Sequence, residues 1–320
     1  MDFAMTAVRT ALNGASYVAP RLAGGAAFRL FRKPRGRSRL RPDERPLTDR
    51  AEVGEIVVGG GKAVSYRWGT GARPVLLVHG WESRGSRFAP LVSELLDLGL
   101  SPVTFDAPGH GDATGETMTI VDLRDIIAEL DARHGPFEMV VAHSLGVTAT
   151  FLALREGGAR QSRQSRLVRT ERPVRTERLV AISGVPDFAY LVDRFCERLG
   201  LRARLNAELR GRVERELFPG EEDIWSRFSV PRTVPEAGPA SVLVIHDADD
   251  DMVDPACSRA LADALGDRAE LVVTSGLGHR RIIGDPQVTA SVRDFVVRER
   301  AARVGPAAGR PDPSPRPAAG

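Results

Sequence analysis

The fold is decided by the stretch Val140-Val141-Ala142-His143-Ser144-Leu145-Gly146, an apolar run that ends in a small-x-Ser-x-Gly sequence. The run has the length of a buried strand, and a helical segment is expected after it, from Val147 to Leu154. A sharp strand-to-helix turn would lift the Ser144 hydroxyl to the top of a sheet, with only small residues tolerated two before and two after it. Ala142 stands where the usual pattern has glycine, and alanine is still small enough. Ser144 is therefore the candidate nucleophile.

Short apolar runs on both sides of this stretch alternate with helical periods. The runs are typical of strands in a buried parallel sheet and lie at residues 75–78, 103–105, 139–141, 179–182, 242–245 and 271–273. Apolar residues spaced three and four apart, as from Phe88 to Leu96, indicate helices between them. We therefore predict an α/β fold, a mostly parallel twisted sheet with helices on both faces, preceded by a hairpin across residues 59–61. Ligands of such sheets bind at the carboxyl ends of the strands.

The composition is ordinary for a globular protein, with 42% hydrophobic and 27% charged residues in 320. A net charge of +3 excludes a polycation of the nucleic-acid-binding kind. Cys196 and Cys257, the only cysteines, lack metal-ligand spacing and suggest a reducing compartment. No apolar run approaches the ~20 residues of a membrane span, and the N-terminus makes a poor signal peptide. We expect a cytoplasmic location.

The pattern divides the chain into three parts. Residues 1–50 hold a helix and a basic linker, residues 51–300 hold the alternating strands and helices, and residues 301–320 form a proline-rich tail expected to be disordered. Two segments interrupt the middle part. An Arg-rich loop at 155–178 contains a tandem hexapeptide, and an insertion at about 186–239 is placed to form a small helical cap over a pocket.

Each of the two basic segments allows two interpretations. The N-terminal helix and its arginines could contact an anionic membrane surface weakly, or the helix could pack on the domain and lead into a solvated linker. Gly14, Pro20 and Gly24 weaken a long membrane-lying helix and favour packing. The Arg-rich loop could bind anions or nucleic acid, but Pro173 breaks any helix and no aromatic residue is interleaved for base stacking. A duplicated surface loop, with no nucleic-acid partner, is the favoured interpretation.

A second motif, Val78-His79-Gly80-Trp81, directly follows the first buried strand. In this architecture the loop after that strand donates a backbone N–H to an oxyanion, and Gly80 lets the backbone come close. We expect Trp81 and Leu145 to form an oxyanion hole, the latter because its N–H lies at a helix N-terminus. His79 precedes the nucleophile and is expected to brace the loop rather than to act as a base.

A third motif, the turn Asp106-Ala107-Pro108-Gly109-His110-Gly111, ends the next strand. Asp106 could serve as the acid of a triad, but aspartates in such turns commonly hold backbone N–H groups. His110 has glycine on both sides and is expected to shape the floor of the pocket. Neither residue is a preferred catalytic candidate.

The acid of a triad is expected in the run Asp247-Ala248-Asp249-Asp250-Asp251, which follows a strand and comes after the serine. A triad needs one carboxylate to orient the imidazole and to stabilise its charged form. Spacing between the turn residue Asp247 and Val253 favours Asp250, with Asp249 and Asp251 as rivals. Alternating acids could instead bind a metal, but the glycine and distal glutamate of a calcium loop are missing. No metal is expected.

The general base is predicted to be His279, which follows Gly276-Leu277-Gly278 after the last strand. A histidine in such a loop is poorly explained by core packing. The chain order of nucleophile, acid and histidine is the one that this fold uses. Other histidines have structural explanations: His134 lies near a helix end, His143 is expected to point away from the serine, and His246 sits at a strand end.

Together these motifs resemble the α/β-hydrolase superfamily, in its single-domain branch, over residues 53 to about 300. The His-Gly-Trp loop, the Asp-Ala-Pro-Gly-His-Gly turn, the Ala-His-Ser-Leu-Gly elbow and the Gly-Leu-Gly-His loop all fall in family order. The resemblance implies the α/β-hydrolase fold and esterase-like hydrolysis without a metal or an organic cofactor. Serine at the elbow disfavours the dehalogenase and epoxide-hydrolase branches, which use aspartate.

The expected substrate is a small molecule with an ester-like carbonyl, which Ser144 would attack while His279 takes its proton and Asp250 orients the imidazole. A thioesterase or an acyltransferase would use the same groups, and a lyase could use them without an acyl-enzyme. A non-catalytic binding module of this fold would usually show a broken triad. Apolar cap residues either line a pocket or pack the cap on the domain: Phe188, Tyr190, Leu191, Phe195, Trp225 and Phe228.

Overall fold

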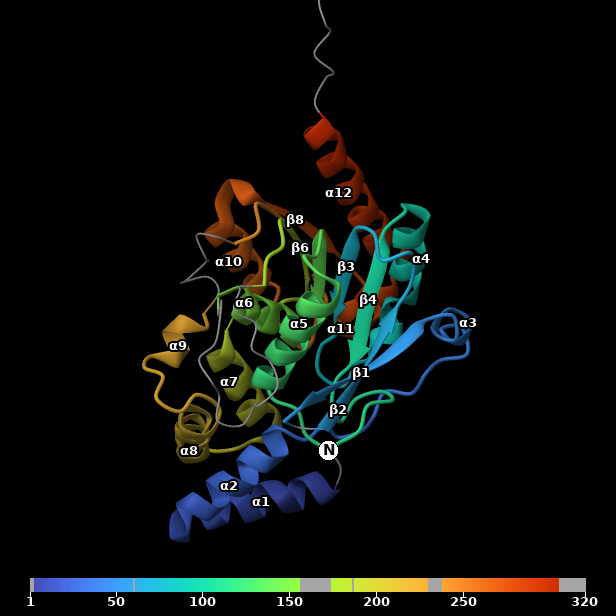
Figure 1. Ribbon diagram of the computed structural model, residues 1–320. Coiled ribbons are helices and arrows are strands. Elements are labelled where there is room, and N and C mark those ends of the chain that lie inside the picture. Colours follow the sequence, from blue (N-terminus) through green and yellow to red (C-terminus); the bar gives the residue numbers. More distant parts are fainter. Residues whose placement is uncertain (1–2, 60, 156–173, 186, 230–237, 305–320) are drawn as a thin grey trace, which may run out of the picture.

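The computed structural model describes residues 3–59, 61–155, 174–185, 187–229 and 238–304, which form one sheet covered by helices (Figure 1). The strands are β1 (Glu52–Val58), β2 (Gly61–Arg67), β3 (Pro74–Val78), β4 (Ser101–Asp106), β5 (Met139–His143), β6 (Arg178–Ile182), β7 (Ser241–Asp247) and β8 (Ala269–Thr274). Their order is β1-β2-β4-β3-β5-β6-β7-β8. Strand β2 is antiparallel to both neighbours, and every pairing from β4 to β8 is parallel. The predicted α/β-hydrolase fold is confirmed.

Helices cover both faces of the sheet, because alternate side chains of each buried strand point to opposite sides. In β3, Val75 and Leu77 belong to one core cluster, whereas Leu76 and Val78 belong to the other. Helices α4 (Ala89–Asp97) and α12 (Pro286–Val304) contribute to the first cluster. Helices α5 (Ile120–His134), α6 (Leu145–Arg155) and α10 (Ala256–Leu265) contribute to the second. The shorter helical elements are α3 (Arg45–Thr48), η1 (Gly85–Phe88), η3 (Gly266–Arg268), α11 (Gly278–Arg281) and η4 (Ile282–Gly284).

The segment after β6 forms the cap with helices α7 (Phe188–Leu199), α8 (Ala203–Arg212), η2 (Val213–Leu217) and α9 (Ile224–Arg227). Asp187 caps α7 at its start by accepting the N–H of Tyr190, and left-handed Gly200 ends it. The cap aromatics pack on one another: the Phe188 ring stacks on Trp225 at 6.1 Å, and Phe218 lies 4.7 Å from Phe228. Phe188 and Phe228 also share a core cluster with residues of α5 and α6, which favours packing of the cap on the domain.

The first part of the chain is a pair of helices, α1 (Phe3–Val18) and α2 (Pro20–Phe31), which lie at the lower end of the molecule in Figure 1. Helix α2 packs against α8, where Glu208 and Arg212 crowd Gly24 and Gly25. Phe31 lies 5.2 Å from the ring of Phe195 on α7. The hairpin of α1 and α2 is thus seated on the cap.

The basic segment that follows α2, residues 32–44, is called here the strap. The Arg37 guanidinium donates to the carbonyls of residues 111, 113 and 115. The backbone N–H of Arg35 donates to Glu82 at 3.0 Å, and buried Glu44 accepts the hydroxyl of Ser86 at 2.6 Å. The strap therefore differs from a solvated linker, because its polar groups are bonded to loops of the central domain.

Several predicted segments lie largely outside the described residues. These are most of the Arg-rich loop (156–173), part of the cap (230–237) and the tail from residue 305. Arg178, the last arginine of the repeat, is buried and pairs with Glu138 at 2.9 Å. Cys196 and Cys257 are free thiols. Within the described ranges, no helix combines the length and hydropathy needed to cross a membrane.

Candidate active site

Ser144 lies at the turn from β5 into α6, with a backbone φ of 54°. This left-handed conformation is strained for a residue with a side chain, and it is fixed by neighbouring elements. The Ser144 N–H donates to the carbonyl of Ile182 at 3.0 Å. A side chain at Gly146 would approach the carbonyl of Val78 to 2.7 Å, which explains why this position must be glycine. The turn therefore has the geometry predicted from the small-x-Ser-x-Gly sequence.

The structure brings Ser144, His279 and Asp250 into one hydrogen-bonded chain. Nε2 of His279 lies 3.0 Å from Oγ of Ser144, and Nδ1 lies 2.7 Å from Oδ2 of Asp250. All three residues are buried, with exposed fractions of 7%, 6% and 9% for Ser144, His279 and Asp250. A carboxylate can only accept, so the imidazole proton is on Nδ1 and the unprotonated Nε2 faces the serine hydroxyl.

The acids that follow β7 have different hydrogen-bond partners. Asp250 contacts His279, whereas Asp249 accepts the N–H of Gly276 at 2.7 Å and Asp251 is exposed to solvent. Asp247 accepts the N–H of Gly278 at 2.8 Å and so ties the acid loop to the histidine loop. The geometry thus distinguishes Asp250 from both rivals that the sequence left open.

Electrostatics keep Asp250 ionised. Burial raises its pKa, but hydrogen bonds from His246 and His279 and the charge of His279 outweigh burial, so that the pKa lies well below its usual value. The carboxylate is therefore available to stabilise a protonated His279. In the described part of the chain, no group of three or more His, Cys, Asp or Glu residues is arranged to hold a metal ion.

The loop after β3 is pressed against the elbow at Gly80. A Cβ at Gly80 would lie 2.7 Å from Cβ of Ser144 and 3.0 Å from the carbonyl of His143, so only glycine fits. Trp81 is the residue after Gly80, so its backbone lies close to Ser144. Leu145 is the first residue of α6, where backbone N–H groups lack partners within the helix. Within the described part of the chain, the backbone N–H groups of Trp81 and Leu145 donate to no other residue.

Two buried histidines brace this loop. His79 donates from Nδ1 to the carbonyl of Gly80 at 2.8 Å and accepts the N–H of Ala107 at 3.1 Å. His110 donates to the carbonyl of Pro108 at 2.9 Å and accepts the N–H of Glu82 at 3.0 Å. Burial lowers the pKa of His79 to about 4 and that of His110 to about 3. Both rings are therefore neutral at pH 7, as acceptors of backbone N–H groups must be.

Asp106 holds the turn that carries His110, as its position predicts. Its carboxylate accepts the N–H of Gly85 at 2.8 Å and the N–H of Asp112 at 2.9 Å. It also pairs with the buried Arg84 at 3.1 Å. Asp106 therefore fixes the loop after β3 and does not contact His279.

Sequence reasoning missed two further histidines. Nε2 of His246 lies 3.3 Å from Oδ2 of Asp250 and 3.1 Å from the carbonyl of Val253. Because both neighbours only accept, Nε2 carries the proton, and Nδ1 accepts the hydroxyl of Ser258 at 2.6 Å. His246 and His279 thus both donate to Oδ2 of Asp250, whose Oδ1 accepts the backbone N–H groups of Met252 and Val253. The spacing of four residues between His246 and Asp250 was the only available signal.

The second missed residue is His143. Its ring lies 4.8 Å from the ring of His279, and Nε2 lies 2.9 Å from the backbone carbonyl of His279. Burial lowers the pKa of His143 well below its ordinary value, so the ring is neutral and donates this hydrogen bond. The sequence predicted only that His143 points away from Ser144. It did not indicate this contact, which holds the backbone of the histidine loop.

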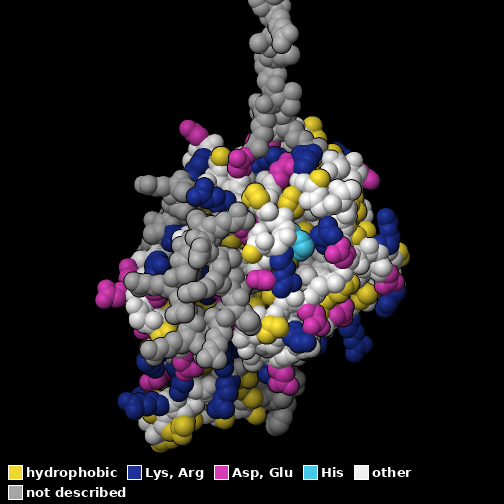
Figure 2. Space-filling model, viewed as in Figure 1, with side chains coloured by type: hydrophobic (Ala, Val, Ile, Leu, Met, Phe, Trp, Pro, Cys, Tyr) yellow, Lys and Arg dark blue, Asp and Glu magenta, His cyan; other side chains and the backbone are white. Residues whose placement is uncertain are grey.

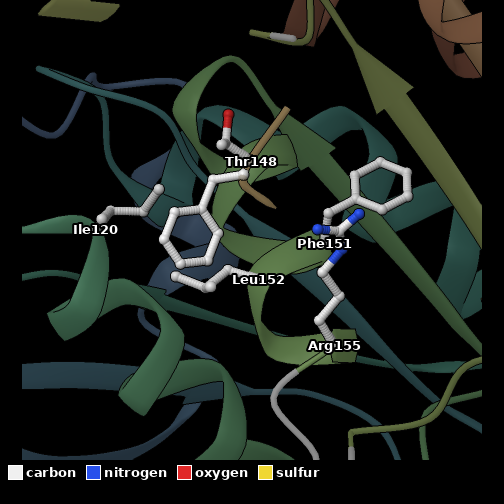
Figure 3. A pocket seen from close by; sticks show the side chains of 6 residues that line it. Ile120, Thr148, Phe151, Leu152 and Arg155 are labelled. Carbon is white, nitrogen blue, oxygen red and sulfur yellow. The ribbon is translucent and has the colours of Figure 1, made fainter. Parts of the chain in front are cut away.

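A small cavity lies beside α6, away from these groups. Figure 3 shows Phe151 and Leu152 of α6 and Ile120 of α5 around it, with Arg155 at the end of α6. Arg155 donates to the carbonyl of Arg227 on α9. Ser144, Asp250 and His279 do not line this cavity. We therefore assign it no part in the chemistry of the serine.

The sheet order, the elbow and the loops at the carboxyl edge define an α/β-hydrolase architecture. The sequence model described as "Alpha/beta hydrolase family" matches residues 75–292, which is more than half of the chain. The chain therefore belongs to the alpha/beta hydrolase family.

Curated relatives include enzymes of two activities. The chain is 28% identical over 244 residues to a pimeloyl-[acyl-carrier protein] methyl ester esterase of Xanthomonas axonopodis, covering 69% of this chain and 94% of that protein. It is 30% identical over 134 residues to the non-heme chloroperoxidase CPO-A1 of Kitasatospora aureofaciens. The latter match covers 40% of this chain and only 47% of the chloroperoxidase. The family and the esterase relative support a hydrolase.

Solved structures share the fold at low sequence identity. The mouse alpha/beta hydrolase domain-containing protein 10 superposes with a TM-score of 0.57 at 15% identity, covering 78% of this chain and all of that one (100%). The Pyrococcus furiosus esterase PF2001 gives a TM-score of 0.55 at 19% identity, covering 84% and 98%. At these identities, the structural similarity shows the fold alone.

Proposed function

We propose that the protein is a carboxylic ester hydrolase that works through an acyl-enzyme on Ser144. The observation that carries this proposal is the continuous hydrogen-bonded chain from Ser144 through His279 to Asp250. A non-catalytic module of this fold would have no reason to keep all three groups buried and aligned. The similarity to a methyl ester esterase, which covers 94% of that protein, favours an ester as the substrate.

In the proposed reaction, Nε2 of His279 accepts the Ser144 proton as Oγ attacks the ester carbonyl. Asp250 stabilises the imidazolium that forms, and His246 keeps the carboxylate in place. The N–H groups of Trp81 and Leu145 stabilise the oxyanion of the tetrahedral intermediate. His279 then gives its proton to the leaving alcohol. A water molecule, deprotonated by the same imidazole, attacks the acyl group and regenerates Ser144.

The decisive experiment measures hydrolysis of p-nitrophenyl esters of graded chain length by the full chain and by Ser144→Ala. Loss of the nucleophile should lower kcat by about 10⁴-fold or more. Ser291→Ala, on α12 and away from the elbow, is the matched control and should keep full activity. A fluorophosphonate should label the parent protein and Ser291→Ala, but not Ser144→Ala.

The same panel tests the alternatives on this triad. A thioester and an amide should be hydrolysed more slowly than the best ester, and an added alcohol should not compete with water for the acyl group. Faster turnover of the thioester would assign a thioesterase instead, and efficient transfer to the alcohol an acyltransferase. Full activity of Ser144→Ala would contradict the assignment of the nucleophile.

A further inference from the structure

The connection between α1 and α2 exposes a compact apolar tip, which consists of Tyr17, Val18 and Leu22. Their exposed fractions are 59%, 86% and 76%. Figure 2 shows hydrophobic side chains at this lower end of the molecule, next to basic ones. Isolated exposed apolar residues are common, but three within six positions at a protruding turn form a contiguous patch. Such patches mark interaction surfaces.

The hairpin itself carries only basic charge, and α8 adds Glu208, which packs against Gly24. Residues 3–42 contain no aspartate or glutamate, and their basic residues are Arg9, Arg21, Arg29, Arg32, Lys33, Arg35, Arg37, Arg39 and Arg41. The cations of the strap are largely committed, as Lys33 to Glu116 at 2.7 Å and Arg35 to Glu82. By contrast, exposed Arg21 and Arg204 have no ion-pair partner among the described residues. Unpaired positive charge is therefore found on the hairpin and on α8, whereas part of the charge of the strap is neutralised by acids.

Tyr17 and Arg202 form an amphipathic pair at the same place. The Arg202 guanidinium lies 5.5 Å from the centre of the Tyr17 ring and donates to its hydroxyl. Tyrosine and arginine are the residues that occupy the boundary between lipid headgroups and acyl chains, with the apolar part inward and the polar end at the phosphates. Val18 and Leu22 would lie on the acyl side of that boundary.

We infer that the hairpin tip docks on an anionic lipid surface. Apolar insertion and attraction between guanidinium groups and lipid phosphates act together at such a surface. A second copy of the chain fits less well, because it would bring the same acid-free hairpin, whose arginines would repel. Three side chains also fall far short of the ~800 Å² per partner that a stable protein interface buries. A bilayer needs no complementary shape.

Docking at the tip has a consequence for the cap. The hairpin packs on α8, and Phe31 of α2 contacts Phe188 of α7 at 6.1 Å. The cap follows β6, so it lies at the carboxyl edge of the sheet, where Ser144 is. A docked hairpin would therefore hold the cap and the adjacent site close to the lipid surface. This inference concerns where the protein sits and is independent of the reaction proposed for Ser144.

The test is co-sedimentation of the full chain with phosphatidylcholine vesicles with and without phosphatidylglycerol. All proteins carry Ser144→Ala, so that no lipid is hydrolysed. Binding is expected to the anionic vesicles, to be much weaker to neutral ones, and to fall with added salt. Val18→Asn/Leu22→Gln should weaken binding to the anionic vesicles roughly tenfold or more. Arg21→Gln/Arg204→Gln should also weaken it roughly tenfold.

The matched apolar control is Val53→Asn/Val57→Gln on β1, where the two valines are 60% and 49% exposed. This control should bind as the parent does, and far-ultraviolet circular dichroism should show that every variant is folded. The inference is overturned if the parent does not bind anionic vesicles or if the tip and control variants bind equally. It is also overturned if light scattering shows a dimer that the tip variant abolishes, which would make the tip a self-association surface.

Discussion

The two loops that converge on Ser144 are held mainly by different groups, although the neutral imidazole of His143 also bonds to the His279 loop. On the side of Gly80 and Trp81, neutral imidazoles of His79 and His110 accept backbone N–H groups. On the side of His279, the carboxylates of Asp247 and Asp250 do the same work, and hydrogen bonds hold both carboxyl pKa values below their usual range although burial opposes this. At neutral pH the imidazoles of His79 and His110 are uncharged, and the carboxylates of Asp247 and Asp250 are ionised. The two sides should therefore fail under different challenges.

The largest effect is expected on the carboxylate side. Asp250→Asn removes the charge that stabilises protonated His279 and should lower kcat by about 10⁴-fold. Asp249→Asn is the matched control, because within the described ranges the Asp249 carboxylate accepts only the N–H of Gly276, and its kcat should change little. Ester hydrolysis at saturating substrate measures both. Equal losses would mean that the acid had been assigned to the wrong residue.

On the opposite side, Gly80→Ala should displace the loop that carries Trp81, since its Cβ would lie 2.7 Å from Cβ of Ser144. Losing one oxyanion donor costs about 10²- to 10³-fold in kcat. Gly14→Ala, at a helical glycine with open space around its Cβ position, serves as the control and should leave kcat unchanged. Unaltered activity in Gly80→Ala would exclude this loop from the chemistry.

A smaller loss is expected from His246→Asn, which weakens the support of Asp250 without touching Ser144 or His279. A hydrogen bond to a charged group is worth about 1.5–3 kcal/mol, which corresponds to a roughly tenfold to hundredfold fall in kcat. KM should stay constant, and the rate of fluorophosphonate labelling should fall in parallel. If only thermal stability changed, His246 would have a purely structural role.

Mild acid should weaken the side held by His79 and His110, and the buried neutral His143 should add to the same loss of stability. The pKa values of His79 and His110 are about 4 and about 3 in the folded chain, below about 6.5 in the unfolded chain. The unfolded state therefore binds more protons below pH 6.5, and stability falls as the pH is lowered from there. By pH 5 each ring should cost on the order of 2 kcal/mol.

Urea unfolding between pH 7.5 and 5 measures this decline. His110→Gln keeps an acceptor for the N–H of Glu82 but cannot titrate, so its stability should depend less on pH than that of the parent. A parent stability that stays level over this range would contradict neutral bracing by the two histidines.

Much of the fold and of the candidate site was predictable because the signals are local. Each strand is a short apolar run, and Ser144, Asp250 and His279 each follow the end of one. The contact between His246 and Asp250 was not predictable from spacing alone, since it depends on how the intervening turn folds. The same holds for Arg37, whose three carbonyl partners lie more than seventy residues away in the chain.

The strap has a practical consequence for anyone who trims this chain. The family match begins at residue 75, and cutting there would remove not only β1 and β2 but also Arg35, Arg37 and Glu44. Three carbonyls of the loop at 111–115 would then lose their partner, and Glu82, beside Trp81, would keep Arg280 but lose Arg35. A fragment chosen by homology alone would thus expose the edge of β4 and leave the loop at 111–115 less firmly held. Boundaries for expression, fusion or domain exchange belong upstream of residue 32.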